Sequence, residues 1–244
     1  MSDRPALAPQ AHAYDLHLHS RRSYDGVMSP RRIVAMARRR GLRGIAVTDH
    51  GTIAGGLEAR AVAPADLLVI VGSEVYTTVG DIIGLFLTGE IRGRDPLDVI
   101  AQIHEQGGVA ILPHPLHGHR ALTEAVLRAV DGYEVLNARA GRFDLHGAPH
   151  DVPWRALAGK ATLAASDAHL PWELGRAWTI IGGEPSESNV AAQLRAGRAE
   201  PGGGRSHPAN FYASQAVKLL KTRDVGMLAR LARRAARRMT RRRD

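Results

Sequence analysis

The stretch from Asp15 to Ser20, DLHLHS, lies near the N-terminus and is the segment from which the fold can be read outward. It has the character of a strand end, in which alternate side chains share a face. His17 and His19 then project together, while Leu16 and Leu18 pack on the other side. Two imidazoles on one face form half of a metal site, so further ligands are expected from later segments.

The composition limits what such a site can contain. The chain has no cysteine, which excludes disulfides and thiolate zinc sites, and its twelve histidines leave His, Asp and Glu as the available ligands. There is also no GxSxG motif and no Walker-type glycine loop. A metal site built from imidazoles and carboxylates is therefore the chemistry that the composition allows.

The length of 244 residues suits one large domain, and no linker divides it. The N-terminus lacks the pattern of a signal peptide, and no apolar run approaches the roughly 20 residues of a membrane helix. We therefore expect a cytoplasmic protein. The net charge of +9 comes from the end of the chain, because residues 218–244 carry eleven Lys and Arg against two Asp.

Apolar runs and turn signals alternate along the chain in a way that is typical of repeated strand and helix units. After the opening strand, the predicted helices are 30–40, 52–62, 96–106, 123–130, 152–158 and 186–196, with a long helix from Phe211 onward. The predicted strands are 44–50, 67–78, 81–88, 109–114, 132–138, 161–166 and 177–182, and residues 202–204 are predicted as a flexible glycine loop. This alternation predicts an α/β fold with a parallel barrel or an open parallel sheet.

Polar residues recur where the predicted strands end, and in parallel α/β folds these ends share one face. Each signal has an ordinary alternative: His17 and His19 could be a surface pair, Glu74 an ion-paired carboxylate and His114 a turn residue. Together they match what clustered divalent ions require. Two or three ions about 4 Å apart can clamp a phosphate and lower the pKa of a bound water, which gives hydrolysis without a protein nucleophile. The residues at the strand ends are His17, His19, Asp49, His50, Glu74, His114, Asn137, Asp167 and His169.

The motifs DLHLHS, TDHG, GSE, LPHP, EVLNAR and SDAH, in this order from about residue 14 to 183, resemble the PHP (polymerase and histidinol phosphatase) family of metal-dependent phosphoesterases. The resemblance implies a distorted (β/α)7 barrel with two or three divalent ions, Mn, Zn or Fe, at the C-terminal ends of its strands. It also implies a ligand set. The first ion would take His17, His19, Glu74 and Asp167, the second Glu74 and His114, and the third Asp25, His50 and His169.

Asp25 lies in SYDG, which could be an ordinary turn, but its place after the HxH motif favours a ligand. Asp49 is expected to orient His50 from outside the ligand shell. Asn137 stands where many members of the family have a His or Cys ligand, which puts the second ion in question.

Phosphate recognition requires cations beside the metals, and Arg139 and Arg142 are the leading candidates, with His207 as a further one. Solvated loop arginines are the alternative. His117 and His119 form a second HxH motif in a glycine-containing loop, where we expect mainly loop residues.

Two regions are predicted: a PHP-like domain over residues 1–210 and a basic C-terminal helical tail over residues 211–244. The tail is either a solvated helix or a surface for nucleic acid or an anionic membrane. The predicted activity is divalent-metal-dependent hydrolysis of a phosphate mono- or diester by a metal-activated water, with a nucleotide or short oligonucleotide favoured over another phosphorylated small molecule. The alternative is a non-catalytic, metal-stabilised module that binds nucleic acid or a partner through its tail.

Overall fold

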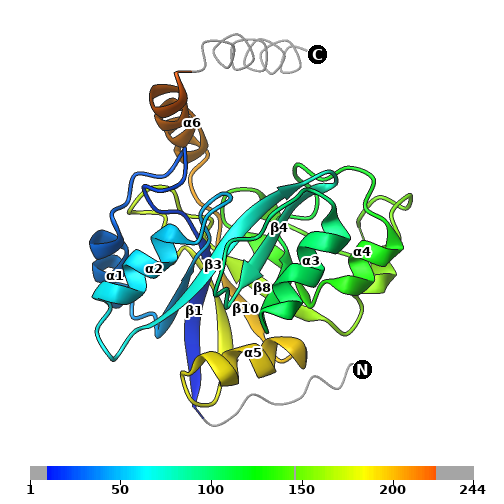
Figure 1. The fold of residues 1–244 in the computed structure, drawn as a ribbon, viewed down its shortest axis with the longest axis horizontal. Coiled ribbons are helices and arrows are strands. Elements are labelled where there is room, and N and C mark those ends of the chain that lie inside the picture. The colour runs from blue at the N-terminus through cyan, green and yellow to red at the C-terminus, as the bar shows by residue number, and fades with distance from the viewer. Residues whose placement is uncertain (1–9, 146, 224–244) are drawn as a thin grey trace.

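A computed structural model describes residues 10–145 and 147–223. Strands and helices alternate along most of this length (Figure 1). The strands are β1 (Ala11–Leu18), β2 (Gly44–Val47), β3 (Leu68–Thr77), β4 (Gly80–Leu85), β5 (Val109–Leu112), β6 (Gly132–Asn137), β7 (Gly141–Arg142), β8 (Ala161–Ala165), β9 (Ala177–Gly182) and β10 (Glu200–Gly203). The helices are α1 (Pro30–Arg39), α2 (Ala54–Val62), α3 (Pro96–Glu105), α4 (Glu124–Ala129), the 3-10 helix η1 (Trp154–Leu157), α5 (Glu187–Arg195) and α6 (Ala209–Thr222).

The strands form one curled sheet in the order β10-β9-β1-β2-β3-β4-β5-β6-β7, with β8 paired to β6. The residues after β8 return to β1, because the N–H of His19 donates to the carbonyl of Ala168 at 2.8 Å and that of Asp167 to the carbonyl of His17 at 2.8 Å. The path β1-β2-β3-β4-β5-β6-β8 is thus closed at the end where β1 finishes. This confirms the predicted distorted α/β barrel.

The expectation of an entirely parallel sheet was wrong around β4, which runs antiparallel to both β3 and β5. The cause is the short turn that joins β3 to β4, with Thr77 paired to Gly80. A parallel connection requires a crossover of a dozen or more residues, so a turn of this length can only form a hairpin. The start of β4 therefore lies beside the end of β3.

Helix boundaries follow their capping residues. The side chain of Ser29 accepts a hydrogen bond from the N–H of Arg32, Pro30 occupies the first turn of α1, and Gly41 follows the helix with φ of 69°. Asp95 and Pro96 begin α3 in the same way. The predicted helix over 152–158 is the short helix η1.

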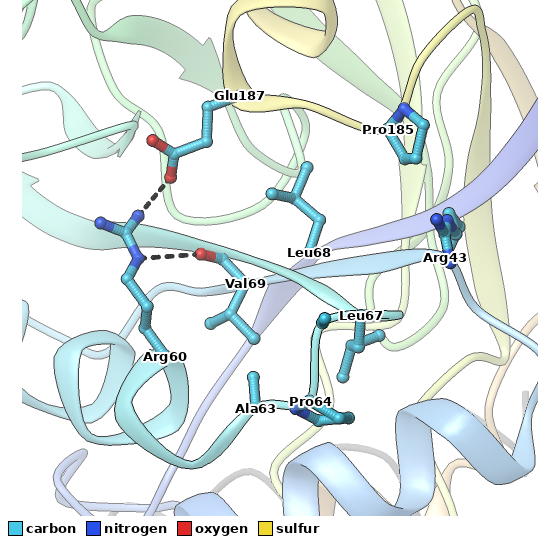
Figure 2. A pocket seen from close by; sticks show the side chains of 10 residues that line it. Arg43, Arg60, Ala63, Pro64, Leu67, Leu68, Val69, Pro185 and Glu187 are labelled. Carbon is cyan, nitrogen blue, oxygen red and sulfur yellow. Dashed lines mark hydrogen bonds and ion pairs between the residues drawn. The ribbon is translucent and has the colours of Figure 1, made fainter.

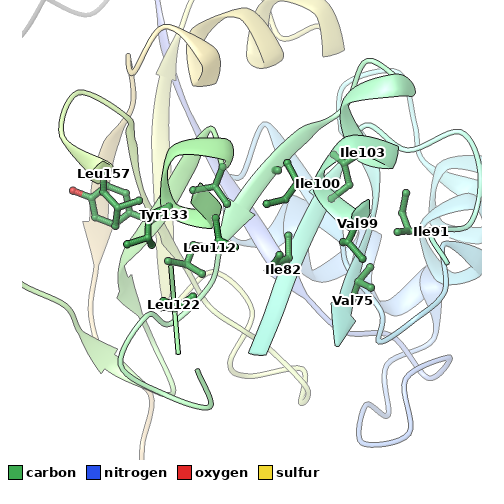
Figure 3. Close-up of a cluster of buried hydrophobic side chains, with 14 of the residues drawn as sticks. Val75, Ile82, Ile91, Val99, Ile100, Ile103, Leu112, Leu122, Tyr133 and Leu157 are labelled. Atoms are coloured by element: carbon green, nitrogen blue, oxygen red, sulfur yellow. The ribbon is translucent and has the colours of Figure 1, made fainter. Parts of the chain in front are cut away.

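Apolar side chains fill both the inside of the barrel and the space under its helices. One cluster joins the outer face of β3, β4 and β5 to α3 and includes Val75, Ile82, Ile100 and Ile103 (Figure 3). A second joins β1 and β2 to α1, and a third fills the barrel and reaches α5. Helix α5 covers the end of the barrel where β1 begins, and α6 lies at the opposite end (Figure 1).

The C-terminal part departs from expectation at one segment. Residues 202–204 were predicted as a flexible loop, but Gly202 and Gly203 belong to β10, which pairs antiparallel with β9. Glycine is required for packing here, because a Cβ at Gly202 would lie 2.6 Å from the indole nitrogen of Trp178. Helix α6 covers only the first part of the predicted basic tail helix, up to Thr222, and residues 224–244 lie outside the described residues, so the basic tail helix stays a prediction. Among those described, no helix is long and apolar enough to cross a membrane. The boundary at residue 210 stays a prediction.

Candidate metal centre

The residues predicted as metal ligands meet at the end of the barrel where β1 finishes. β1 supplies His17 and leads to His19, β3 supplies Glu74, and the other members lie on the loops that follow strands. Their donor atoms form three groups, and within each group one atom per residue lies within 4.8 Å of the others. The first group is His17, His19 and Asp167, the second is Glu74, Asp81 and His114, and the third is His19, Asp25, His50 and His169. All eight predicted ligands are included.

The first group has the spacing of ligands around one ion. The Nε2 atoms of His17 and His19 face each other at 3.1 Å. The distances from His19 Nε2 to Glu74 Oε2 and Asp167 Oδ1 are 3.3 and 3.4 Å, and the corresponding distances from His17 are 3.4 and 3.6 Å. A tetrahedral ion with bonds of about 2.0 to 2.1 Å separates its ligands by about 3.3 Å. Glu74 and Asp167 thus each lie beside both imidazoles, at separations that suit ligands of one divalent ion.

Glu74 faces two groups at once. Its Oε2 atom points to His17 and His19 and lies 3.1 Å from Nδ1 of His50, while its Oε1 atom lies 3.1 Å from Nε2 of His114. The carboxylate of Asp81 belongs to the group around His114. Because the two oxygens of Glu74 face different neighbours, this carboxylate is placed to bridge two ions.

The third group surrounds Asp25. Its Oδ2 atom lies 3.2 Å from Nε2 of His169 and 3.6 Å from Nε2 of His50. Its Oδ1 atom is buried and has no hydrogen-bond partner among the described residues. A buried, unsatisfied carboxylate oxygen is costly without a cation or donor, so this oxygen fits a position next to an ion.

Hydrogen bonds outside the cluster orient four of the imidazoles. In each ring Nδ1 has a partner and Nε2 faces the other ligands, which is the arrangement that metal-bound histidines require. The Nδ1 partners are Glu134 Oε1 for His17 (2.8 Å), Ser23 Oγ for His19 (3.0 Å), the His117 carbonyl for His114 (3.0 Å) and the Asp167 carbonyl for His169 (2.9 Å). His119 also supports the loop, through a 2.9 Å hydrogen bond from Nε2 to the carbonyl of Pro113.

Two of these residues have a backbone conformation that L-residues seldom adopt. His114 has φ of 29° and Asp167 has φ of 52°. Positive φ at a residue other than glycine costs energy and concentrates at functional sites. Packing around both loops therefore holds the two side chains toward the cluster against a local preference.

The cluster attracts positive charge. Burial opposes the charge of His17, but the surrounding carboxylates, Asp167 first, raise its pKa well above the ordinary value. Burial also opposes the charge of His19, yet hydrogen bonds to Asp167 and Glu74 raise its pKa to about 10. Against the same effect of burial, Glu74 raises the pKa of His114 to about 9. Protons on these rings and cations among them would compensate the same negative charge.

Asp81 is a member of the cluster that the sequence analysis missed. It lies in β4, where it pairs with Tyr76, two residues beyond Glu74 on β3. Glu74 and Tyr76 share a face because they alternate along the strand, and directly opposed residues share a face as well. Burial, and next the charge of Glu74, raise the pKa of Asp81 to about 6. The hairpin register was the signal that could have identified Asp81, because it places Asp81 on the same face of the sheet as Glu74.

Glu134 was also missed, and it stands directly behind the ligands. It is 1% exposed and accepts hydrogen bonds from Nδ1 of His17 and from the backbone N–H of His114, both at 2.8 Å. Asn137 donates to it from Nδ2 at 2.9 Å, and its Oδ1 accepts the N–H of Arg139 at 3.0 Å. The amide oxygen of Asn137 thus faces the backbone, and its amino group supports the carboxylates.

Asp49 was predicted to orient His50, but the hydrogen bonds of its carboxylate go to Ser20. Its carboxylate accepts hydrogen bonds from the N–H and the hydroxyl of Ser20 at 2.6 and 2.7 Å. It therefore ties the end of β2 to the end of the His17 strand, while the N–H of His50 donates to Ser23 Oγ at 3.0 Å.

The cations predicted to bind phosphate occupy three different environments. Arg139 has a buried side chain that hydrogen-bonds to Ser214, pairs with Glu173 at 3.7 Å and lies over the ring of Phe211. It joins β6 to α6, so its guanidinium is already engaged. Arg142 lies exposed on β7. His207 accepts the N–H of Ala209 at 3.2 Å, in the first turn of α6.

A separate hollow lies at the opposite end of the barrel, where β3 begins (Figure 2). Arg60 lines it, but this guanidinium pairs with Glu187 and donates to the carbonyl of Val69 at 3.1 Å. None of the predicted ligands lines this hollow. The chemistry-bearing residues are therefore confined to the other end.

The structure combines an α/β barrel with clustered His, Asp and Glu side chains that could hold metal ions at one end. Comparison with known families agrees. The PHP domain model matches residues 15–140 and the PHP-associated model matches residues 154–199. The chain belongs to the PHP family.

The chain is also similar to a curated protein in sequence and to solved structures in fold. An uncharacterized protein, MJ1587, from Methanocaldococcus jannaschii is 41% identical over 138 residues, which cover 51% of this chain and 81% of that protein. A two-domain protein from Bacteroides vulgatus, described as containing a predicted PHP-like metal-dependent phosphoesterase, has a TM-score of 0.68 at 20% identity, over 88% of this chain and 74% of that one. A lesion-specific endonuclease from Pyrococcus furiosus has a TM-score of 0.61 at 16% identity, over 79% and 58%.

Proposed function

We propose that this protein is a divalent-metal-dependent phosphoesterase that hydrolyses a phosphate mono- or diester. The observation that carries the proposal is the inward-facing donor set of His17, His19, Glu74 and Asp167, with separations of 3.1 to 3.6 Å. Structural metal sites are usually closed by four ligands from one small group. Three adjoining groups, two of which share His19, instead suit ions with positions left for water and substrate.

The proposed ligands follow the three groups of donors. Glu74 would complete the ligand set of the first ion and also bind the second. Asp81 would supply a carboxylate ligand to the second ion, in place of the ligand that many family members have at the position of Asn137. The first ion takes His17, His19, Glu74 and Asp167, the second Glu74, Asp81 and His114, and the third Asp25, His50 and His169.

When bound, the ions would polarise the phosphate and lower the pKa of an attacking water. The contribution of the protein is to hold the ligands in the required state. Glu134 keeps Nε2 of His17 free by binding its Nδ1, and the carbonyl of His117 does the same for His114. With no cysteine in the chain and the centre formed by imidazoles and carboxylates, a protein nucleophile is not required.

A nucleotide or short oligonucleotide is the favoured substrate class. The endonuclease among the fold neighbours supports it, and so does the sequence of residues 218–244, with eleven basic residues against two acidic ones. A cationic segment binds phosphate backbones in a salt-dependent way. Removing residues 224–244 should therefore weaken turnover of a short RNA most strongly at low salt, reduce the salt dependence of that turnover, and spare an aryl phosphate.

The activity is tested with aryl phosphate mono- and diesters in the presence of Mn²⁺ or Zn²⁺, before and after chelation. His17→Ala and Asp167→Ala should abolish turnover, because each removes a donor from the first group. His104→Ala is the control, since this histidine is remote and pairs with Asp131 at 2.9 Å. Hydrolysis that survives both chelation and the ligand substitutions would refute the proposal.

A second candidate is a metal-stabilised module without catalysis, which binds nucleic acid through the basic tail. The concentration of the net charge in residues 218–244 favours it. Metal-loaded protein that binds RNA but turns over none of a panel of phosphorylated metabolites, nucleotides and short RNA would support this candidate instead.

A further inference from the structure

Helix α6 lies at the end of the barrel where the proposed metal centre is (Figure 1), and it contacts the loop of Asp25 through Lys221 and the side chain of Arg139 through Ser214. Lys221, near its C-terminal end, donates from Nζ to three backbone carbonyls, those of Arg21, Ser23 and Gly26, at 2.9, 2.8 and 2.6 Å. All three carbonyls belong to the loop that carries Asp25. One ammonium group therefore fixes this loop from outside.

The loop itself touches every other member of the third group. The hydroxyl of Ser23 lies 3.0 Å from Nδ1 of His19 and accepts the N–H of His50 at 3.0 Å. The N–H of Val27 donates to the carbonyl of His169 at 3.2 Å. A displacement of the loop would thus move Asp25 and loosen His50 and His169, whereas His19 is also held from the β1 side by the hydrogen bond from its N–H to the carbonyl of Ala168.

The N-terminal half of α6 is anchored on the opposite side. Ser214 binds Arg139, and Arg139 pairs with Glu173, whose carboxylate accepts the N–H of His169 at 3.1 Å. Seven residues separate Ser214 from Lys221, which is about 10 Å of helix. The helix is therefore a brace between the loop of His169 and the loop of Asp25.

A second lysine of α6, Lys218, contacts the same loop through the ring of Tyr24. The Nζ atom of Lys218 lies 4.2 Å from the centre of the Tyr24 ring, and this ring is stacked on His50 with a centroid distance of 4.6 Å and an interplanar angle of 3°. Tyr24 precedes Asp25 directly. Both lysines of α6 thus act on the same short loop.

Lysine suits this position better than arginine. Three carbonyls around one nitrogen match the three donors of an ammonium group, whereas a guanidinium is planar and presents its donors as a fork. The chain contains three lysines and thirty arginines. The use of lysine at this point therefore follows from the geometry of the carbonyls and not from the general composition.

We propose that Lys221 is a positioning residue for the third ion, and that α6 assembles this subsite by holding the Asp25 loop. This inference rests on the proposed metal centre. The first and second groups of ligands make no such contact with Lys221, so they should bind ions whether or not the brace is intact.

The experiment measures the number of Mn²⁺ ions bound per full-length chain and their affinities, by calorimetry and elemental analysis, for the wild type and Lys221→Met. We expect the third ion to bind 10- to 100-fold more weakly in the variant, the range seen when groups behind a ligand are lost. Two ions should bind as in the wild type. Lys221→Arg should behave like Lys221→Met.

Lys160→Met is the matched control. Lys160 donates to the carbonyls of Arg128 and Val130 at 2.9 and 2.6 Å, far from the metal centre, so its loss should lower stability and leave all ions bound. Wild-type affinity for the third ion in Lys221→Met would overturn the inference. Equal weakening of all ions in both variants, or a wild type that binds two ions, would overturn it as well. A wild type that binds no ion would refute the metal centre itself.

Discussion

Replacing Glu134 by glutamine isolates the effect of the residues behind the ligands. The substitution keeps the volume of the side chain and removes its charge. Glu134 accepts three hydrogen bonds, from His17 Nδ1 at 2.8 Å, from the N–H of His114 at 2.8 Å and from Asn137 Nδ2 at 2.9 Å. Glutamine has one acceptor oxygen and one amino group, so it cannot serve all three donors.

The cost follows from that mismatch. If the introduced amino group faces His17, the ring must accept at Nδ1 and carry its proton on Nε2, where it blocks the ion. If the amino group faces His114 and Asn137, it meets the N–H of His114 and the Nδ2 of Asn137, and a donor then faces a donor at each contact. Each hydrogen bond to a charged group is worth about 1.5 to 3 kcal/mol. We therefore expect Mn²⁺ to bind about 10- to 100-fold more weakly, close to 1.4 to 2.7 kcal/mol.

Calorimetric titration of metal-free protein with Mn²⁺ measures this loss. Asp131→Asn is the matched control, because Asp131 likewise accepts from an imidazole, His104 Nε2 at 2.9 Å, and from a backbone N–H, that of Ala110 at 2.7 Å. It lies at the start of β6, away from the ligands. The control should lose stability and keep its metal affinity. Unchanged affinity in Glu134→Gln, or equal losses in both variants, would refute the reasoning.

Three further outcomes are expected. Asp81→Asn should lower the metal content by one ion per chain in elemental analysis, and full occupancy would show that Asp81 is not a ligand. Loading with Mn²⁺ at pH 8 should release protons, detected with an indicator dye, because the carboxylates raise the pKa of His19 to about 10 and of His114 to about 9 against the effect of burial. Burial, and next His114, lower the pKa of His119 to about 4 from 6.5, and its Nδ1 has no partner among the described residues. Between pH 6.5 and 4 the unfolded chain therefore binds a proton at His119 that the folded metal-free protein does not bind. The free energy of unfolding should fall by up to about 3 kcal/mol over this range. In urea titrations, His119→Gln should lack this part of the fall.

Seven of the eight predicted ligands could be identified because carboxyl ends of neighbouring strands meet at one end of a barrel, and Asp25 was added by the resemblance to the PHP family. The same reasoning overlooks Asp81. β4 is antiparallel to β3, so its beginning, and not its end, lies at the metal centre. A search restricted to residues that follow strands passes over a carboxylate near the start of one. The turn that joins the two strands was the available signal.

Other features depend on tertiary partners that lie far along the sequence. Arg139 follows a strand end and has the charge for phosphate, but Glu173 and Ser214 engage it and Phe211 covers it. Glu134 could have been recognised by the reasoning used for Glu74, since both are carboxylates inside apolar strands. Its partner His17 is 117 residues away, so its role could not be read from local sequence.

The balance of charge explains why the third subsite matters. Five carboxylates are gathered beside the imidazoles, and once these rings are neutral, as metal ligation requires, cations must compensate the carboxylates. With two divalent ions the formal sum is one negative charge, which repels a phosphate ester, and with three ions it is one positive charge, which attracts it. In the proposed centre the sign would thus depend on whether the third ion binds beside Asp25. The five carboxylates are Asp25, Glu74, Asp81, Glu134 and Asp167.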